Sequence, residues 1–186
     1  SAPSKMPGPA FNLPATACIT GSKLVYVLSS TCSGCYALKG RYRFPNVKEA
    51  MDRRLAALQD PRWVSGMIEL IKGRPVFRWH DSGDIQSAQH LINIFEICKA
   101  TPETRHWLPT REAKFLKFID PDIIPANMII RLSGHMIDGK NATWWPWTSS
   151  VSTQGKTCPA RDQGNQCKSC RACWNREVPN VTYPKH

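Results

Sequence analysis

The chain has 186 residues and a mass of 21.0 kDa, enough for one domain or one domain with a small appendage. Its composition, 41% hydrophobic and 21% charged, is near the globular average and excludes general disorder. No apolar stretch is long enough to cross a bilayer, and residues 1–9 lack the apolar run of a signal peptide. We therefore expect no membrane partner.

The charge and the cysteine count narrow the class further. Twenty-five Lys and Arg against fourteen Asp and Glu give a net charge of +11. Such a protein either binds an acidic partner such as nucleic acid or carries a buried anionic centre that the formal count omits. The eight cysteines are clustered too closely for four disulfides. They favour a shared metal centre in a reducing compartment.

The chain predicts an irregular arm followed by repeated strands and helices. Prolines disfavour regular structure over residues 1–22. The expected strands cover 24–28, 75–79, 105–108 and 128–132; the expected helices begin near 47, 61 and 87, with a short one through 115 and 118.

This rhythm of strand, polar loop and helix implies parallel strands with crossover helices. Four units are too few for a closed eight-stranded barrel. The predicted fold class is α/β, either a partial (β/α) barrel or a short parallel sheet. Residues 23–137 form this α/β domain, and residues 138–186 form a Trp-rich connector and a cysteine-rich segment packed on the same domain.

Polar residues directly follow each expected strand. In parallel α/β folds the carboxyl ends of the strands form the edge where ligands bind. We therefore expect one shared edge to carry Cys32, Cys35, Asp81, Asp84, Thr110, Arg111, Ser133 and His135.

The strongest chemical signal is Cys158 followed by Cys167, Cys170 and Cys173. Three thiolates separated by two residues each can surround one face of an iron–sulfur cluster, and a fourth from upstream can complete it. Structural zinc more often takes two separated pairs of ligands. The tail spacing therefore favours a 4Fe–4S cluster, with zinc as the alternative.

A second cysteine group lies near the N-terminus. Cys32 and Cys35 form a CxxC pair, which is found in redox pairs, zinc sites and clusters. Cys18 would be a third ligand, leaving one iron of a cluster open to a small molecule. A competing arrangement has a single cluster, in which Cys32 and Cys35 meet two tail cysteines. Cys98 lies on an apolar helix face and is expected in the core.

Other polar residues have a functional and a structural interpretation. Asp81 or Asp84 would act as a base, bind a hydroxyl or cap the next helix. Thr110 and Arg111 would bind an anion or form a salt bridge. His135 is expected to be a loop residue. The tryptophans of 144–147 would stack on bases or cover the cysteine-rich segment.

The chain resembles the bacteriophage gene product 88-like family of small cysteine-rich proteins. The motifs that carry this resemblance are Cys-Ser-Gly-Cys-Tyr-Ala-Leu-Lys-Gly (32–40), Arg-Trp-His-Asp-Ser-Gly-Asp (78–84), Pro-Thr-Arg (109–111), Arg-Leu-Ser-Gly (131–134) and the cysteine-rich tail. The resemblance implies a phage origin and a metal centre, but no particular reaction. It also places the protein in the cytoplasm of the infected host cell.

The chain is more faintly similar to radical SAM enzymes, which hold a 4Fe–4S cluster by three cysteines after the first strand of a partial barrel. Cys32 and Cys35 match the last two cysteines of that loop, whereas the first falls on Leu28, so Cys18 would replace it. By this likeness, cofactor-binding residues would be Ser82, Gly83 and Asp84, and S-adenosylmethionine would be the cofactor.

The resulting functional prediction is a phage-encoded iron–sulfur protein with a redox or radical SAM-like role. Asp84 and Arg111 would orient a ligand at the open iron, and a host or phage protein would be the redox partner. One alternative is a basic nucleic-acid-binding module with a structural metal, zinc or iron–sulfur. A second alternative is a zinc-stabilised interaction protein.

Overall fold

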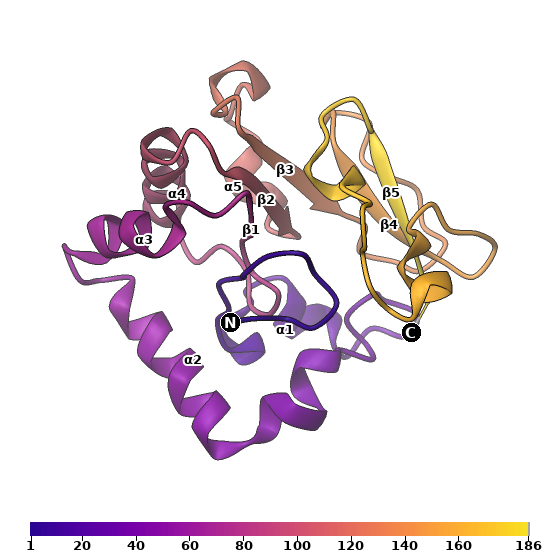
Figure 1. Ribbon diagram of the computed structural model, residues 1–186. Coiled ribbons are helices and arrows are strands. Elements are labelled where there is room, and N and C mark those ends of the chain that lie inside the picture. Colours follow the sequence, from indigo (N-terminus) through magenta and orange to yellow (C-terminus); the bar gives the residue numbers. More distant parts are fainter. Residues whose placement is uncertain (186) are drawn as a thin grey trace.

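The computed structural model describes residues 1–185 and contains a five-stranded sheet in which every neighbouring pair is parallel. The strand order is sequential, and the sheet curls into a half barrel (Figure 1). The strands are β1 (Val76–Arg78), β2 (Arg105–Thr110), β3 (Met128–Ser133), β4 (Thr148–Ser152) and β5 (Asn180–Pro184). The predicted α/β fold of partial-barrel type is confirmed.

The longer helices start and stop where local chemistry directs them. Pro45 opens α2 (Pro45–Ala57), and the Ser87 hydroxyl caps α4 (Ala88–Ala100) by accepting a 3.0 Å hydrogen bond from the backbone of His90. Gly73, with φ +74°, follows α3 (Trp63–Ile71) in the left-handed conformation that often ends helices. Two one-turn helices, α1 (Gly21–Leu24) and α5 (Ala113–Leu116), complete the set.

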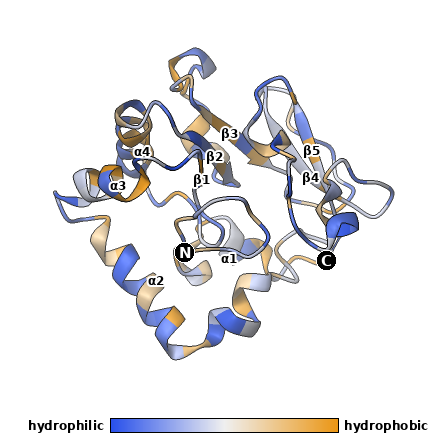
Figure 2. Ribbon diagram, viewed as in Figure 1, coloured by the Kyte–Doolittle hydropathy of each residue, from blue (hydrophilic) through white to orange (hydrophobic). Residues whose placement is uncertain are grey.

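Alternating side chains give the sheet two different faces. Phe77, Leu108 and Ile130 point to the face that α3 and α4 cover, where the main core lies. Their strand neighbours Trp107 and Ile129 point into the concave face and pack around Trp174 of the tail, with Val76. Figure 2 shows hydrophobic colour on β3, whereas α2 is mixed along its length and buries only Met51. The half barrel is therefore filled from inside by its own C-terminal segment.

A further segment of the N-terminal arm lies along β1. Ala10 forms a parallel bridge with Arg78, and the Phe11 amide donates to the Arg78 carbonyl at 3.0 Å. The amide of Leu13 donates to the carbonyl of Ser82, also at 3.0 Å. Ala10, Phe11 and Leu13 are buried, so this segment extends the edge of the sheet.

The strand predicted over Leu24–Leu28 is wrong. Leu24 ends α1, and the following residues form turns in which Tyr26 and Leu28 are 90% and 88% exposed. Hydrophobicity alone cannot make a strand without a neighbour to pair with. The edge of the sheet beside β1 is already occupied by the arm.

Other expectations met mixed outcomes. The short helix through Phe115 and Phe118 ends at Leu116, and Phe118 is 93% exposed. Strands β4 and β5 lie in the segment expected to be connector and tail. Cys98 is buried in the main core, as predicted. Within residues 1–185, no helix is long and apolar enough to span a membrane.

The tryptophan segment packs inward. Trp145 is buried in the main core and donates from Nε1 to the Ile130 carbonyl at 2.8 Å. Trp147 donates to the carbonyl of Arg176 in the tail at 2.9 Å, whereas Trp144 is half exposed. These contacts fit a packing role for the segment.

Candidate functional site

The loop that carries Cys32 is anchored to the carboxyl ends of two strands. The Thr31 amide donates to the His135 carbonyl at 2.8 Å, and its hydroxyl donates to the Gly134 carbonyl at 3.0 Å. From the end of β2, Arg111 Nε donates to the Thr31 hydroxyl at 3.0 Å. Cys32, Arg111 and His135 therefore lie at one edge, as expected, although Cys32 reaches it from a turn and follows no strand.

Glu112 fixes the segment that follows Cys18. One carboxylate oxygen accepts from the Thr20 amide at 2.7 Å and the other from the Thr20 hydroxyl at 2.8 Å. Glu112 is fully buried. Its role was missed by the sequence analysis. The only signal was an acidic residue directly after the Pro109-Thr110-Arg111 run, which does not identify a partner 92 residues away.

Gly21 lies between the sulfurs of Cys18 and Cys32. A Cβ placed on Gly21 would lie 3.6 Å from the Cys18 sulfur and 3.7 Å from the Cys32 sulfur. The two sulfurs are thus no farther apart than the sum of these distances. Cys35 belongs to the same turn, because its amide donates to the Cys32 carbonyl at 3.0 Å. The three predicted N-terminal ligands are therefore neighbours.

The electrostatics of this group reflect its burial. Burial and, to a smaller extent, the nearby Asp84, Cys35 and Cys32 together raise the pKa of the Cys18 thiol to about 12. Burial also raises the pKa of Cys32, whereas the positive charge of Arg111 lowers it. Without a metal, the Cys18 thiol would stay protonated at neutral pH. A bound metal ion deprotonates its thiol ligands outright.

Asp84 is fixed by three donors. Its Oδ1 accepts from the Thr110 hydroxyl at 2.6 Å and the Ile85 amide at 2.8 Å, and its Oδ2 accepts from the Arg111 amide at 2.8 Å. Burial raises the pKa of Asp84 to about 6, although these hydrogen bonds lower it. The residue joins the loop after β1 to the end of β2.

Ser82 and Gly83 hold the same loop against the arm. The Ser82 hydroxyl donates to the Leu13 carbonyl at 2.6 Å. Gly83 has φ +77°, and a Cβ there would lie 2.5 Å from Leu13 Cβ. Glycine is thus required by both conformation and space. The predicted cofactor-binding residues Ser82, Gly83 and Asp84 lie beside the cysteine edge and make structural contacts there.

The tail cysteines gather near β5 and the N-terminal arm. The Cys158 amide donates to the Thr182 carbonyl at 3.0 Å, and Cys173 Sγ lies 3.1 Å from the Tyr183 hydroxyl. The amide of Cys167 donates to the Lys5 carbonyl, and that of Cys170 to the Cys167 carbonyl, both at 2.9 Å.

Neighbouring groups shift the pKa values of the tail thiols in opposite directions. Burial raises the pKa of Cys173 to about 11 and also raises the pKa of Cys167. Negative charge on Cys158 raises both pKa values, whereas Arg131 lowers that of Cys173 and Lys5 lowers that of Cys167. The positive charges of Arg131 and Lys5 would therefore offset part of the negative charge of thiolates in this group.

Arg131 holds the last tail cysteine from inside the half barrel. It is fully buried, and its Nε donates to the Cys173 carbonyl at 3.1 Å. Its Nη2 donates to the carbonyls of Ala172 and Asn175 at 2.8 and 2.9 Å, and its Nη1 donates to that of Thr148 at 3.2 Å. One side chain of β3 thus fixes the turn that contains Cys173.

All eight cysteines are free thiols. Among residues 1–185, no three His, Cys, Asp or Glu side chains are grouped closely enough to hold one metal ion.

The two remaining residues predicted at the edge form ordinary hydrogen-bond contacts: the Ser133 hydroxyl lies 3.1 Å from that of Ser149, and His135 Nε2 lies 3.3 Å from the Arg111 carbonyl.

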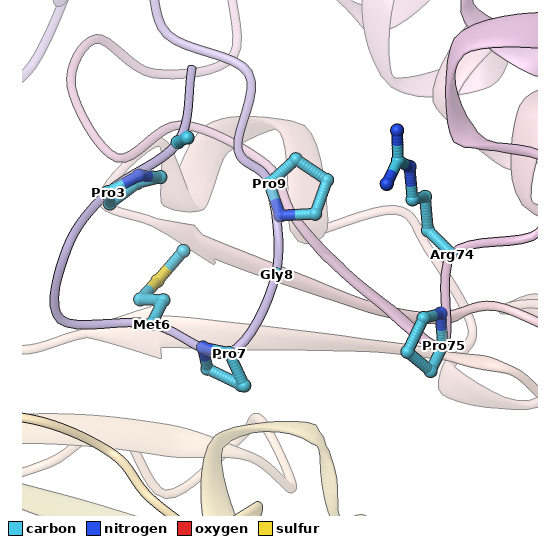
Figure 3. A pocket seen from close by; sticks show the side chains of 8 residues that line it. Pro3, Met6, Pro7, Gly8, Pro9, Arg74 and Pro75 are labelled. Atoms are coloured by element: carbon cyan, nitrogen blue, oxygen red, sulfur yellow. The ribbon is translucent and has the colours of Figure 1, made fainter.

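A surface hollow of about 390 Å³ lies elsewhere, formed by the N-terminal arm and the residues before β1 (Figure 3). Proline rings, Met6 and Arg74 line it. The cysteine edge does not contribute to its lining.

The geometry defines a half-barrel α/β protein with a cysteine-bearing loop at the carboxyl edge of its strands and a cysteine-rich tail that packs on its concave face through Cys173 and Trp174. The chain belongs to the bacteriophage gene product 88 family, because residues 2–176 match the family model described as Gene product 88. This confirms the family resemblance. Searches of curated proteins and of solved structures found no significant match.

Proposed function

We propose that the protein binds iron–sulfur clusters at two cysteine groups, one formed by Cys18, Cys32 and Cys35 and the other by the four tail cysteines. The observation that carries this proposal is the shared position of the Cys18 and Cys32 sulfurs around Gly21, at the carboxyl edge of the strands. Parallel α/β folds bind their ligands at that edge.

The donor set suits clusters. Seven thiols contribute, and no histidine lies among the proposed ligands. A four-iron cluster binds each thiolate through a different iron, so its ligands stand apart. Four thiolates on one zinc, at Zn–S distances of about 2.3 Å, must approach within about 4 Å of each other. The contacts around Gly21 set an upper limit on the distance between the Cys18 and Cys32 sulfurs that allows both spacings.

The division into three and four ligands has electrostatic support. Cys32 and Cys35 raise the pKa of Cys18, and Cys35 raises that of Cys32. In the tail, Cys158 raises the pKa of both Cys167 and Cys173. A three-cysteine cluster would supply electrons and leave one iron open to a small ligand such as S-adenosylmethionine.

The neighbouring residues would position that ligand. Arg111 uses Nε to hold Thr31, which leaves its terminal N–H groups for an anionic part of the ligand. Asp84 acts through its hydrogen bond to the Arg111 amide, since three donors already occupy its carboxylate. We place this activity in the cytoplasm of an infected host cell, with a host or phage protein as redox partner.

Two alanine variants test the division. Cys35→Ala should lower iron and sulfide content, because it removes one of three ligands at the edge. Cys98→Ala serves as the matched control, because it removes a thiol that is buried in the core. Iron and acid-labile sulfide would be counted per chain on anaerobically purified protein. Equal iron content in the two variants would refute the assignment of Cys35.

The net charge of +11 favours a second candidate, a nucleic-acid-binding protein with a structural metal. Phosphate contacts release counterions, so binding to a DNA or RNA duplex should weaken steeply as salt rises. A binding constant that is immeasurably small at low salt would eliminate this candidate.

A further inference from the structure

Three arginines lie in or against the core, and one of them forms few hydrogen bonds. Arg131 donates four hydrogen bonds to backbone carbonyls, and Arg176 donates three. Arg78 on β1 has a buried Nε without a partner. Its contacts with the Met6 sulfur and the His80 carbonyl are both 3.5 Å long. Within residues 1–185 it forms no ion pair.

The N–H groups of this guanidinium have one missing partner and two long contacts. Its central carbon lies 4.5 Å from the centre of the Trp107 ring, which covers one flat face. The N–H groups of an arginine point outward in its plane, where they match a carboxylate in two parallel hydrogen bonds. Leaving the buried Nε without a hydrogen-bond acceptor destabilises the fold unless something else binds it.

An acceptor of the opposite charge lies nearby with one oxygen unused. Asp81 is only 6% exposed, and its Oδ1 is buried without a hydrogen-bond partner. Its Oδ2 accepts from the Tyr42 hydroxyl at 3.1 Å. Burial raises the pKa of Asp81, and the Arg78 charge lowers it, yet the two side chains do not pair within 4 Å.

We propose that Arg78 and Asp81 form a binding site for a small monocarboxylate that carries an amino or hydroxyl group next to its carboxylate. The carboxylate would bind the Arg78 guanidinium, and the amino or hydroxyl group would donate to Asp81 Oδ1. The Asp81 carboxylate, whose charge also acts on Arg78, would repel a multiply charged anion such as phosphate. The site does not depend on iron and would exist in a protein without a cluster.

Met6 of the arm connects the site with a surface hollow. It lines the hollow of Figure 3, and its sulfur contacts Arg78. Arg78 and Asp81 do not line the hollow, so a ligand would reach the guanidinium from there when Met6 moves aside. Methionine changes rotamer at little energetic cost, so it can admit a small ligand.

The test is binding of L-alanine and lactate to the full chain, measured by equilibrium dialysis with labelled ligand and by thermal unfolding at constant ionic strength. The wild type should bind about one equivalent. At ten times the dissociation constant its melting temperature should rise by about 3–6 °C. Acetate, which lacks the second group, and inorganic phosphate should bind more weakly.

Matched variants separate the site from general anion binding. Arg78→Met should abolish the shift, whereas Arg105→Met, which removes the same charge from an exposed position away from the hollow, should preserve it. Arg78→Lys keeps the charge without the planar fork and should weaken binding at least tenfold, which covers poor folding of the methionine variant. Asp81→Asn should remove the preference for alanine over acetate. Equal binding by wild type and Arg78→Lys, or no saturable binding by the wild type, would overturn the proposal.

Discussion

The contact between Glu112 and Thr20 shows how one buried carboxylate can position a distant loop. Two charge-assisted hydrogen bonds join β2 to the segment after Cys18. The sequence could suggest the cysteines as candidate ligands, because their spacing is local. It could not find Glu112, since its partner lies 92 residues away and only folding brings them together.

Replacing Glu112 with alanine should therefore destabilise the protein. The change leaves the Thr20 amide and hydroxyl without their acceptors, and hydrogen bonds to charged groups contribute about 1.5–3 kcal/mol each. We expect the free energy of unfolding in urea to fall by about 3 kcal/mol. Glu103→Ala, at an exposed position, should change it by less than about 0.5 kcal/mol. Similar losses in the two variants would contradict this role.

His106 makes stability depend on pH. It is fully buried, shares a 2.9 Å hydrogen bond with the Thr101 hydroxyl, and burial lowers its pKa to about 4 from 6.5. Between these values the unfolded chain binds a proton that the folded chain does not. The neutral His106 therefore costs the fold no stability above pH 6.5, whereas the free energy of unfolding decreases as the pH falls from 6.5 towards 4.

The variant His106→Gln should reduce that loss by about 2 kcal/mol between pH 7 and pH 4.5, because this interval covers most of the shift in pKa. Urea unfolding at pH 7 and pH 4.5 measures it. If the wild type and the variant lose the same stability between these pH values, His106 is not responsible.

At the scale of elements, helices and apolar central strands were predictable from sequence, and polar edges were not. The pattern of α4 and the apolar run of β3 are both local signals. Strand β4 (Thr148–Ser152) is composed mainly of Ser and Thr and has no comparable signal. The run at 24–28 has a strong signal, but its place beside β1 is filled by residues 9–13. Competition for a pairing site cannot be read from one segment alone.

The tail depends on β3 through Arg131. Arg131→Met should release the turn around Cys173, because four carbonyls lose their donor. We expect a lower melting temperature and loss of the tail cluster, with iron falling by about half if each group holds one cluster. Arg105→Met, exposed at the start of β2, is the control. Full iron content in Arg131→Met would show that the tail site forms without this anchor.

At the scale of the whole molecule, the half barrel brings its two cysteine groups to different parts of one concave structure. The N-terminal group lies at the strand edge, and the tail group lies near β5. Arg78 lies close enough to both Tyr36 and Cys173 for each of them to raise its pKa. The strand–loop–helix rhythm predicted this class of fold. The filling of its interior by the tail was not predictable, because the tail has no regular pattern and its contacts are all long-range.

The most direct test of the central claim is the iron and acid-labile sulfide content of anaerobically purified protein, measured with the absorption spectrum of the same sample. Two clusters predict about eight irons and eight sulfides per chain and a broad brown absorption near 400 nm. About four of each would mean one cluster. A colourless protein that contains zinc and no sulfide would contradict the account.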